Sequence, residues 1–177
     1  MAYEIFAEDS LTSSAASIDL TAIPQTSTHL ELVINARSTK ASTTTNGGEM
    51  TFNGSTSSLY GHNGVYLLGS TSPGIYNLNP NSRNQIDIPF RIMNDSMTAN
   101  LYAQTKMIIP NYTNTSITRK GVLIQTGTGG DSTTVYWTLI SMASWTSSAA
   151  INQITMFAES GSSPFKAGTS YYLAGWE

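Results

Sequence analysis

Apolar and polar residues alternate with a period of two along most of this chain. The pattern is clearest in residues 29–37 (HLELVINAR) and 86–92 (IDIPFRI), and shorter versions surround Met50, Met107 and Met156. Alternation at this period predicts β-strands that bury one face and expose the other. We predict strands near residues 2–7, 16–22, 29–37, 49–53, 85–93, 104–109, 117–126, 133–142, 151–158 and 169–176.

Turn signals separate the predicted strands. Asn-Gly, Pro-Gly and Gly-Gly pairs tolerate the positive φ angles of tight turns. They occur at Asn46-Gly47, Asn53-Gly54, Asn63-Gly64, Pro73-Gly74 and Gly129-Gly130. Many short strands without a convincing helix between them favour an all-β fold, a mostly antiparallel sandwich of two sheets. Residues 38–48 and the longer stretch 54–84 break the alternation and are predicted to be irregular loops.

The length of the chain fits a single domain. Its 177 residues have a mass of 19.0 kDa, which is within the usual range for one hydrophobic core. The strand pattern occupies residues 16–177, which we assign to the sandwich. We expect residues 1–15 to serve as an N-terminal attachment segment.

The composition is poor in charge. Charged residues make up 11 % of the chain, whereas an ordinary soluble domain carries about 25 %. The polar surface must come instead from 24 Ser, 24 Thr and 13 Asn. These short neutral side chains lose little conformational entropy when a partner covers them, which suits a subunit of an assembly. The same scarcity of titratable groups counts against an enzyme.

The charge distribution narrows the possible partners. The net charge is −3 and the basic residues are scattered, so we expect no nucleic-acid partner. No apolar run approaches the roughly 18 residues of a membrane-spanning helix, so we expect no membrane partner. The first nine residues carry three acidic and no basic side chains, unlike a signal peptide. The chain has no cysteine, which excludes disulfides and cysteine-based zinc sites.

Candidate catalytic groups are few. His29 and His62 are the only histidines, and no Gly-x-Ser-x-Gly motif provides a nucleophile beside them. Residues 127–131 (GTGGD) lack the Gly-Lys-Ser/Thr ending of a phosphate loop, and we interpret them as a hairpin turn. No calcium-loop spacing is present. We therefore predict no catalytic residue, no cofactor and no metal site, although an ion shared by three chains on a threefold axis would leave no signal in one sequence.

The stretch 54–84 contains a group of aromatic residues. Tyr60, His62, Tyr66 and Tyr76 lie there among several asparagines. Sugar rings stack on aromatic faces while side-chain amides bind their hydroxyls, so we predict that these four residues contact a glycan or another subunit. The alternative is that the rings pack this stretch onto its own sandwich.

Several segments of the chain carry short sequence motifs whose order and spacing are similar to those of a known protein family. Residues 17–37 hold an alternating strand ending in Ile-Pro, then a His-Leu-x-Leu strand that closes on Arg37. Residues 50–54 (MTFNG), 109–115 (IPNYTNT), 145–157 and 168–175 follow. Together they resemble small β-sandwich modules of tailed-bacteriophage virion proteins, found in tail fibres, minor structural proteins and head appendages. The chain departs from that family in its acidic start and in residues 25–27, which lack an aromatic before His29.

The resemblance implies a jelly-roll-like sandwich, commonly grouped as homotrimers on the outer surface of a virion and made in the cytoplasm of the bacterial host. The resemblance implies no catalytic residue in this chain. We expect a capsid decoration or cement protein that docks on the major capsid protein or another virion structural protein. A tail-fibre or receptor-binding module that recognises host surface glycan is the alternative, and a glycan hydrolase is a third possibility. Fibres normally need a shaft or anchor, and the sandwich fills almost the whole chain, which favours decoration.

Overall fold

The computed structural model describes residues 3–42, 45–68, 74–129, 137–158 and 163–177, and within these ranges it contains twelve strands and no helix. The strands are β1 (Tyr3–Ser10), β2 (Ser17–Leu20), β3 (His29–Ala36), β4 (Asn46–Phe52), β5 (Tyr60–Leu68), β6 (Gly74–Arg83), β7 (Ile86–Ile92), β8 (Ala103–Ile109), β9 (Lys120–Thr128), β10 (Trp137–Trp145), β11 (Ile154–Phe157) and β12 (Ser170–Trp176). The predicted all-β class is confirmed.

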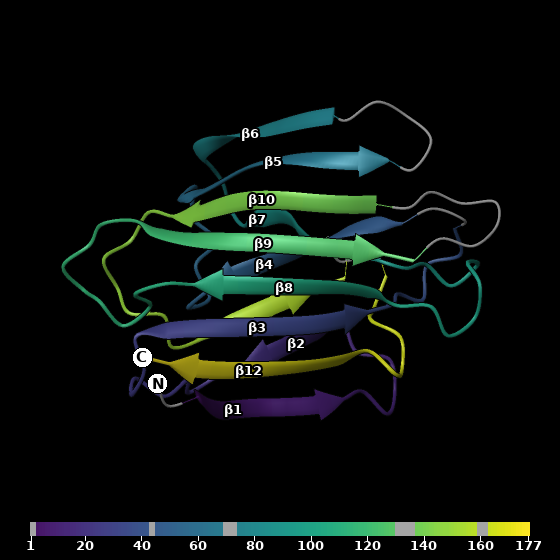
Figure 1. The fold of residues 1–177 in the computed structure, drawn as a ribbon, viewed down its shortest axis with the longest axis horizontal. Coiled ribbons are helices and arrows are strands. Elements are labelled where there is room, and N and C mark those ends of the chain that lie inside the picture. The colour runs from purple at the N-terminus through teal and green to yellow at the C-terminus, as the bar shows by residue number, and fades with distance from the viewer. Residues whose placement is uncertain (1–2, 43–44, 69–73, 130–136, 159–162) are drawn as a thin grey trace.

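The strands form two antiparallel sheets that pack face to face (Figure 1). The eight-stranded sheet has the order β1-β12-β3-β8-β9-β10-β5-β6, and the four-stranded sheet behind it has the order β2-β11-β4-β7. Apart from the β5-β6 and β9-β10 hairpins, the chain pairs from its ends inward, as β1 with β12, β2 with β11, β3 with β8 and β4 with β7. This nested pairing is the order of a jelly roll. The two hairpins extend one of its sheets.

The hairpin β5-β6 corrects the prediction that residues 54–84 are an irregular loop. Glycine and asparagine disguise this strand pair in the sequence. Gly64 lies inside β5 and not at a turn. A Cβ at this position would lie 2.5 Å from the Cβ of Ser141 on β10, which no side chain could accommodate. The glycine therefore allows two strands to approach closely.

The predicted attachment segment lies partly within the sandwich. Tyr3–Ser10 form β1 at the edge of the eight-stranded sheet, paired with β12 along its length. The two ends of the described chain are consequently neighbours, with Tyr3 opposite Trp176 (Figure 1). The attachment role of residues 1–15 stays a prediction.

The core fills the space between the sheets. Leu30, Leu32 and Ile34 on β3 are fully buried against residues of the four-stranded sheet such as Met50 and Phe52. Burial of this apolar surface drives folding and fixes which face of each strand points inward. Tyr60 and Trp145 stack with ring centroids 6.4 Å apart at one end of this core.

Candidate functional site

The outer face of the eight-stranded sheet carries the candidate sites. In a strand, successive side chains point to opposite faces, so every second residue of these strands points away from the core. Two regions on this face differ in character. One is a polar groove over β1, β12, β3 and β8, and the other is an apolar patch over β9, β10, β5 and β6.

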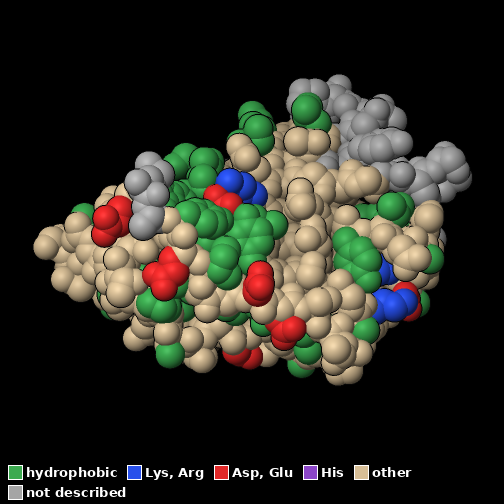
Figure 2. Space-filling model, turned by 60° about the horizontal axis from the view of Figure 1, so that its bottom comes forward, with side chains coloured by type: hydrophobic (Ala, Val, Ile, Leu, Met, Phe, Trp, Pro, Cys, Tyr) green, Lys and Arg blue, Asp and Glu red, His purple; other side chains and the backbone are tan. Residues whose placement is uncertain are grey.

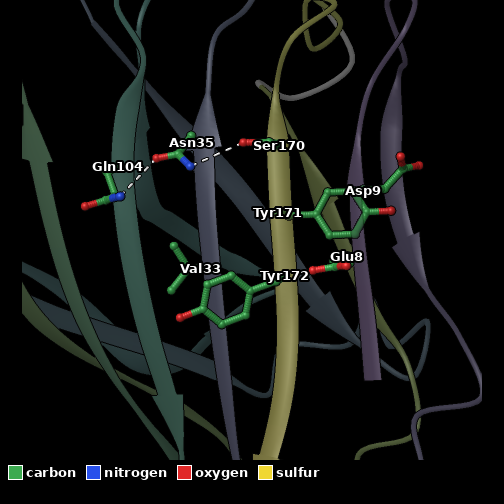
Figure 3. Close-up of a pocket in the computed structure, with 8 residues that line it drawn as sticks. All are labelled: Glu8, Asp9, Val33, Asn35, Gln104, Ser170, Tyr171 and Tyr172. Carbon is green, nitrogen blue, oxygen red and sulfur yellow. Dashed lines mark hydrogen bonds between the residues drawn. The ribbon is translucent and has the colours of Figure 1, made fainter. Parts of the chain in front are cut away.

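The polar groove has a volume of about 470 Å³ (Figure 3). Its walls combine an aromatic platform, side-chain amides and carboxylates, and its described lining residues are Glu8, Asp9, Val33, Asn35, Gln104, Ser170, Tyr171 and Tyr172. They come from four strands that are distant in sequence and adjacent in the sheet. The jelly-roll pairing is what brings them together.

Hydrogen bonds across strands fix the amides of the groove. Gln104 Nε2 donates to Asn35 Oδ1 at 3.2 Å, and Asn35 Nδ2 donates to Ser170 Oγ at 3.3 Å. These three side chains form a polar row across β8, β3 and β12, drawn in Figure 3 with dashed lines. Because each amide is held by a neighbour, its remaining hydrogen-bonding atoms keep a defined direction.

A second network holds Tyr172 in place. Its hydroxyl donates to Glu31 Oε1 at 2.6 Å, and Lys106 Nζ lies 2.6 Å from Glu31 Oε2. Burial tends to raise the pKa of Glu31. The hydrogen bonds from Lys106 and Tyr172, together with the positive charge of Lys106, outweigh this effect and lower the pKa below its ordinary value. The same bond to Glu31 raises the pKa of Tyr172. Both residues therefore keep their ordinary charge states near neutral pH.

The groove region carries more acidic than basic charge. Glu8 and Asp9 line the groove and Glu31 lies beside it, while Lys106, which is also beside the groove, is paired with Glu31. Figure 2, which brings the β1 side of the molecule forward, shows a surface made mostly of backbone and uncharged polar side chains, with hydrophobic side chains among them and scattered acidic groups. Such a surface disfavours an anionic ligand.

The apolar patch is defined by six large side chains that are 37–83 % exposed, namely Val65, Leu67, Ile75, Leu123, Ile140 and Met142. The strand register makes them neighbours, since Val65 lies between Ile75 and Ile140, and Met142 pairs with Leu123. None of the described residues that line the hollow at this patch is charged. Contiguous exposed apolar surface of this kind marks an interaction site.

The described part of the chain shows where three of the four residues predicted to contact glycan or another subunit lie. Tyr60 is fully buried and His62 is 2 % exposed, so neither reaches a ligand in this conformation. Tyr66 is half-buried, and its ring covers Gly74 on the neighbouring strand. The side chain of Tyr76 lies outside the described residues. The alternative interpretation, packing of this stretch onto its own sandwich, fits Tyr60 and His62.

The two buried residues have structural partners. The hydroxyl of Tyr60 accepts a bond from the backbone N–H of Phe52 and donates to the carbonyl of Ser55, both at 3.0 Å. His62 bonds through Nδ1 to the carbonyl of Asp87 at 2.5 Å and through Nε2 to Ser141 Oγ at 2.9 Å. Burial lowers the pKa of His62 to about 4, so the imidazole is neutral at pH 7.

The structure also bears on the segment 127–131, on groups of metal-binding side chains and on membrane-spanning helices. Gly127 and Thr128 end β9, and β9 pairs antiparallel with β10, as expected for a hairpin, while residues 130–136 lie outside the described part of the chain. Among the described residues, no three His, Asp or Glu side chains are grouped so as to hold a metal ion. None of the described segments is a helix long and apolar enough to cross a membrane.

Sequence reasoning missed the groove because its residues carry no motif. Asn35, Gln104 and Tyr172 are single positions on three separate strands, and only the pairing of these strands makes them neighbours. Comparison with known proteins adds no assignment, since neither a protein-family model nor a curated protein matches this chain.

Proposed function

We propose that this protein is a structural protein of a tailed-bacteriophage virion, a decoration subunit that sits as trimers on the outer shell. The observation that carries the proposal is the apolar patch on the outer face of the eight-stranded sheet. An isolated soluble protein gains nothing from six large exposed apolar side chains side by side, whereas a subunit can bury them.

The chemistry of the patch favours a second copy of the chain as the surface that covers it. The hollow at its centre is lined by apolar and neutral polar residues, such as Ile140, Met142 and Asn63. Copies of an uncharged face can meet without bringing like charges together. Placed near a threefold axis, the patch of each subunit would contact those of both neighbours.

Fold and composition support the same role without deciding it. Jelly rolls occur in viral capsid domains, but also in lectins and cupins, so the fold by itself does not assign a function. A chain with 11 % charged residues is suited to permanent contacts, because few charges have to be desolvated when its surface is covered. The resemblance of the sequence to virion β-sandwich modules points the same way.

The oligomeric state tests the role of the patch. Light scattering of the purified protein should give a mass of about 57 kDa, three times 19.0 kDa. Ile140→Glu should shift it to the single-chain mass by placing a charge in the interface. Ile5→Glu is the matched control, because Ile5 is 47 % and Ile140 51 % exposed on the same sheet but Ile5 lies at its far edge, on β1. A single-chain species at micromolar concentration would contradict the trimer.

Particles without the protein test the decoration role. Virions assembled with the gene deleted should release their genome at a lower temperature than complete virions, and added purified protein should restore the difference. Equal release temperatures would argue against a stabilising subunit.

A second candidate function is recognition of host surface glycan, as in a tail-fibre or receptor-binding module. The polar groove favours it, because ligand sites combine a flat apolar surface with a few placed polar groups. Adsorption separates the two functions. Particles that lack a receptor-binding module fail to attach to host cells, whereas particles that lack a decoration subunit still attach.

A further inference from the structure

We infer that the polar groove over β1, β12, β3 and β8 binds a neutral oligosaccharide, with the ring of Tyr172 as its stacking platform. The inference rests on the second function proposed above, glycan recognition, and is independent of the trimeric decoration role. It places the site on the outer face of the sheet, away from Tyr60 and His62.

Tyr172 has the geometry that stacking requires. Its ring extends from β12 over Val33 on β3, its partner in the strand register, and Figure 3 shows it face-on from the outer side of the sheet. One face of the ring therefore covers the sheet, and the other is turned toward the groove. The hydroxyl is fixed by its 2.6 Å bond to Glu31, so little conformational freedom remains to be lost on binding.

The row of Gln104, Asn35 and Ser170 runs beside this platform and matches the hydroxyls of a sugar. Gln104 is exposed, and its amide oxygen is not used in the bond from its Nε2 to Asn35. An amide can both donate to and accept from a hydroxyl, which is how neutral sugars are held in place. The row crosses three strands at about 4.8 Å spacing and continues toward β1, so the groove suits a short oligosaccharide better than a single ring.

The charge of the groove selects neutral over acidic sugars. Glu8 and Asp9 at the β1 end accept hydrogen bonds from hydroxyls but repel carboxylate and sulfate groups. Lys106 is paired with Glu31 at 2.6 Å, and it offers no free positive charge to compensate. Uronate-containing and sialylated glycans are therefore excluded.

A peptide fits the groove less well than a sugar. The backbone groups of β3 and β12 at the floor of the groove pair with neighbouring strands on both sides. A peptide lying across this face would find no main-chain partner, and peptides that bind sheets do so at free edges. The groove offers side-chain amides and an aromatic face, which a sugar uses fully.

Binding of the full-length protein to an array of neutral and uronate-containing bacterial polysaccharides tests the inference. We expect binding to at least one neutral glycan, weakened by about tenfold or more by Tyr172→Ala, which removes the platform. Tyr172→Phe, which keeps the ring and removes the bond to Glu31, should retain most of the affinity. The double variant N35A/Q104A should weaken binding without removing the platform. Thermal unfolding of each variant verifies that it is folded.

Three results would overturn the inference: no neutral glycan bound, binding of uronate polymers only, or unchanged affinity of folded Tyr172→Ala. Tyr66→Ala is the matched control, because Tyr66 belongs to the glycan site first predicted from the sequence and lies outside the groove. Loss of binding in this variant alone would move the site there. None of these results bears on the light-scattering test of the apolar patch, so the two proposals fail separately.

Discussion

His62 on β5 and Ser141 on β10 face each other in the core, with 2.9 Å between the imidazole Nε2 and the hydroxyl oxygen. This pair has the composition of a hydrolytic dyad, but the side chains of both residues are nearly inaccessible. The other ring nitrogen contacts a backbone carbonyl of Asp87 on β7, in the opposite sheet. The imidazole therefore bridges the two sheets.

Protonation of His62 should destabilise the fold in mildly acidic solution. Its pKa of about 4 in the folded chain lies below the value of 6.5 in the unfolded chain. Between these values the unfolded state binds more protons, so the free energy of unfolding decreases as the pH falls, by up to about 3 kcal/mol. Urea unfolding at pH 7 and pH 4.5 measures this loss. His62→Gln should show a smaller loss over the same interval, and an equal loss would assign it to other groups.

Gly48 should not tolerate a side chain. A Cβ at this position on β4 would lie 2.1 Å from Cε2 of Phe90, which is fully buried and cannot move away freely. We expect Gly48→Ala to lower the free energy of unfolding by about 1–3 kcal/mol, the usual effect of overpacking. Gly121→Ala is the control, since a Cβ on Gly121 of β9 meets nothing within 4 Å. Equal denaturation midpoints for the two variants would contradict the close contact.

Arg37 should be one of the most sensitive positions. Its side chain is 3 % exposed, and it donates at 2.7–3.1 Å to four carbonyls in the loop that follows β7, those of Asp95, Met97, Thr98 and Leu101. Removing one buried charged donor leaves several acceptors without a partner, so we expect Arg37→Ala to cost about 3 kcal/mol or more. Urea unfolding measures the loss.

Two further variants serve as comparisons for Arg37→Ala. Arg37→Lys keeps the charge but not the planar fork of donors, and it should recover only part of the stability. Arg119→Ala at an exposed position should change stability by no more than about 0.5 kcal/mol. Near-equal stability of Arg37→Ala and the unmodified protein would show that the four bonds contribute little.

Asn53 should contribute through both its backbone and its side chain. It has φ of 51°, and its side chain bonds to the carbonyl of Ala150 and the N–H groups of Asn152 and Gln153. Asn53→Gly accepts the left-handed backbone but loses these bonds, whereas Asn53→Ala loses the bonds and adds strain of about 1 kcal/mol. We expect the Asn53→Ala variant to unfold at a lower temperature than the Asn53→Gly variant. The reverse order would mean that the backbone strain is relieved in the variant.

The fold class could be predicted from the sequence because alternation survives wherever a strand has one buried face. In residues 29–37 the pattern is unambiguous, and β3 lies there. The hairpin β5-β6 escaped prediction because β5 contains Gly61, Asn63 and Gly64, residues that ordinarily signal turns. Close approach to β10, and not a turn, explains Gly64, and that reason is visible only once the strands are paired.

The candidate site could not be predicted, for a related reason. Tyr60 and His62 look like surface residues in a polar stretch, yet their hydrogen bonds to Phe52 and Ser141 hold them in the core. Tyr172 lies in a segment that reads as an ordinary strand. Its prominence comes from Val33 beneath it and Glu31 beside it, which belong to a strand far away in the sequence.

The pairing of β1 with β12 also bears on how the protein is made. A ribosome delivers β1 long before β12, the strand that completes its hydrogen bonds. Each inner pair of the roll closes a shorter loop than the pair outside it, so nested closure from β4-β7 outward is the entropically cheaper order. Until β12 has been synthesised, β1 remains an unpaired strand open to pairing with another nascent chain, and crowding of ribosomes on one message would favour exchange of this strand between subunits.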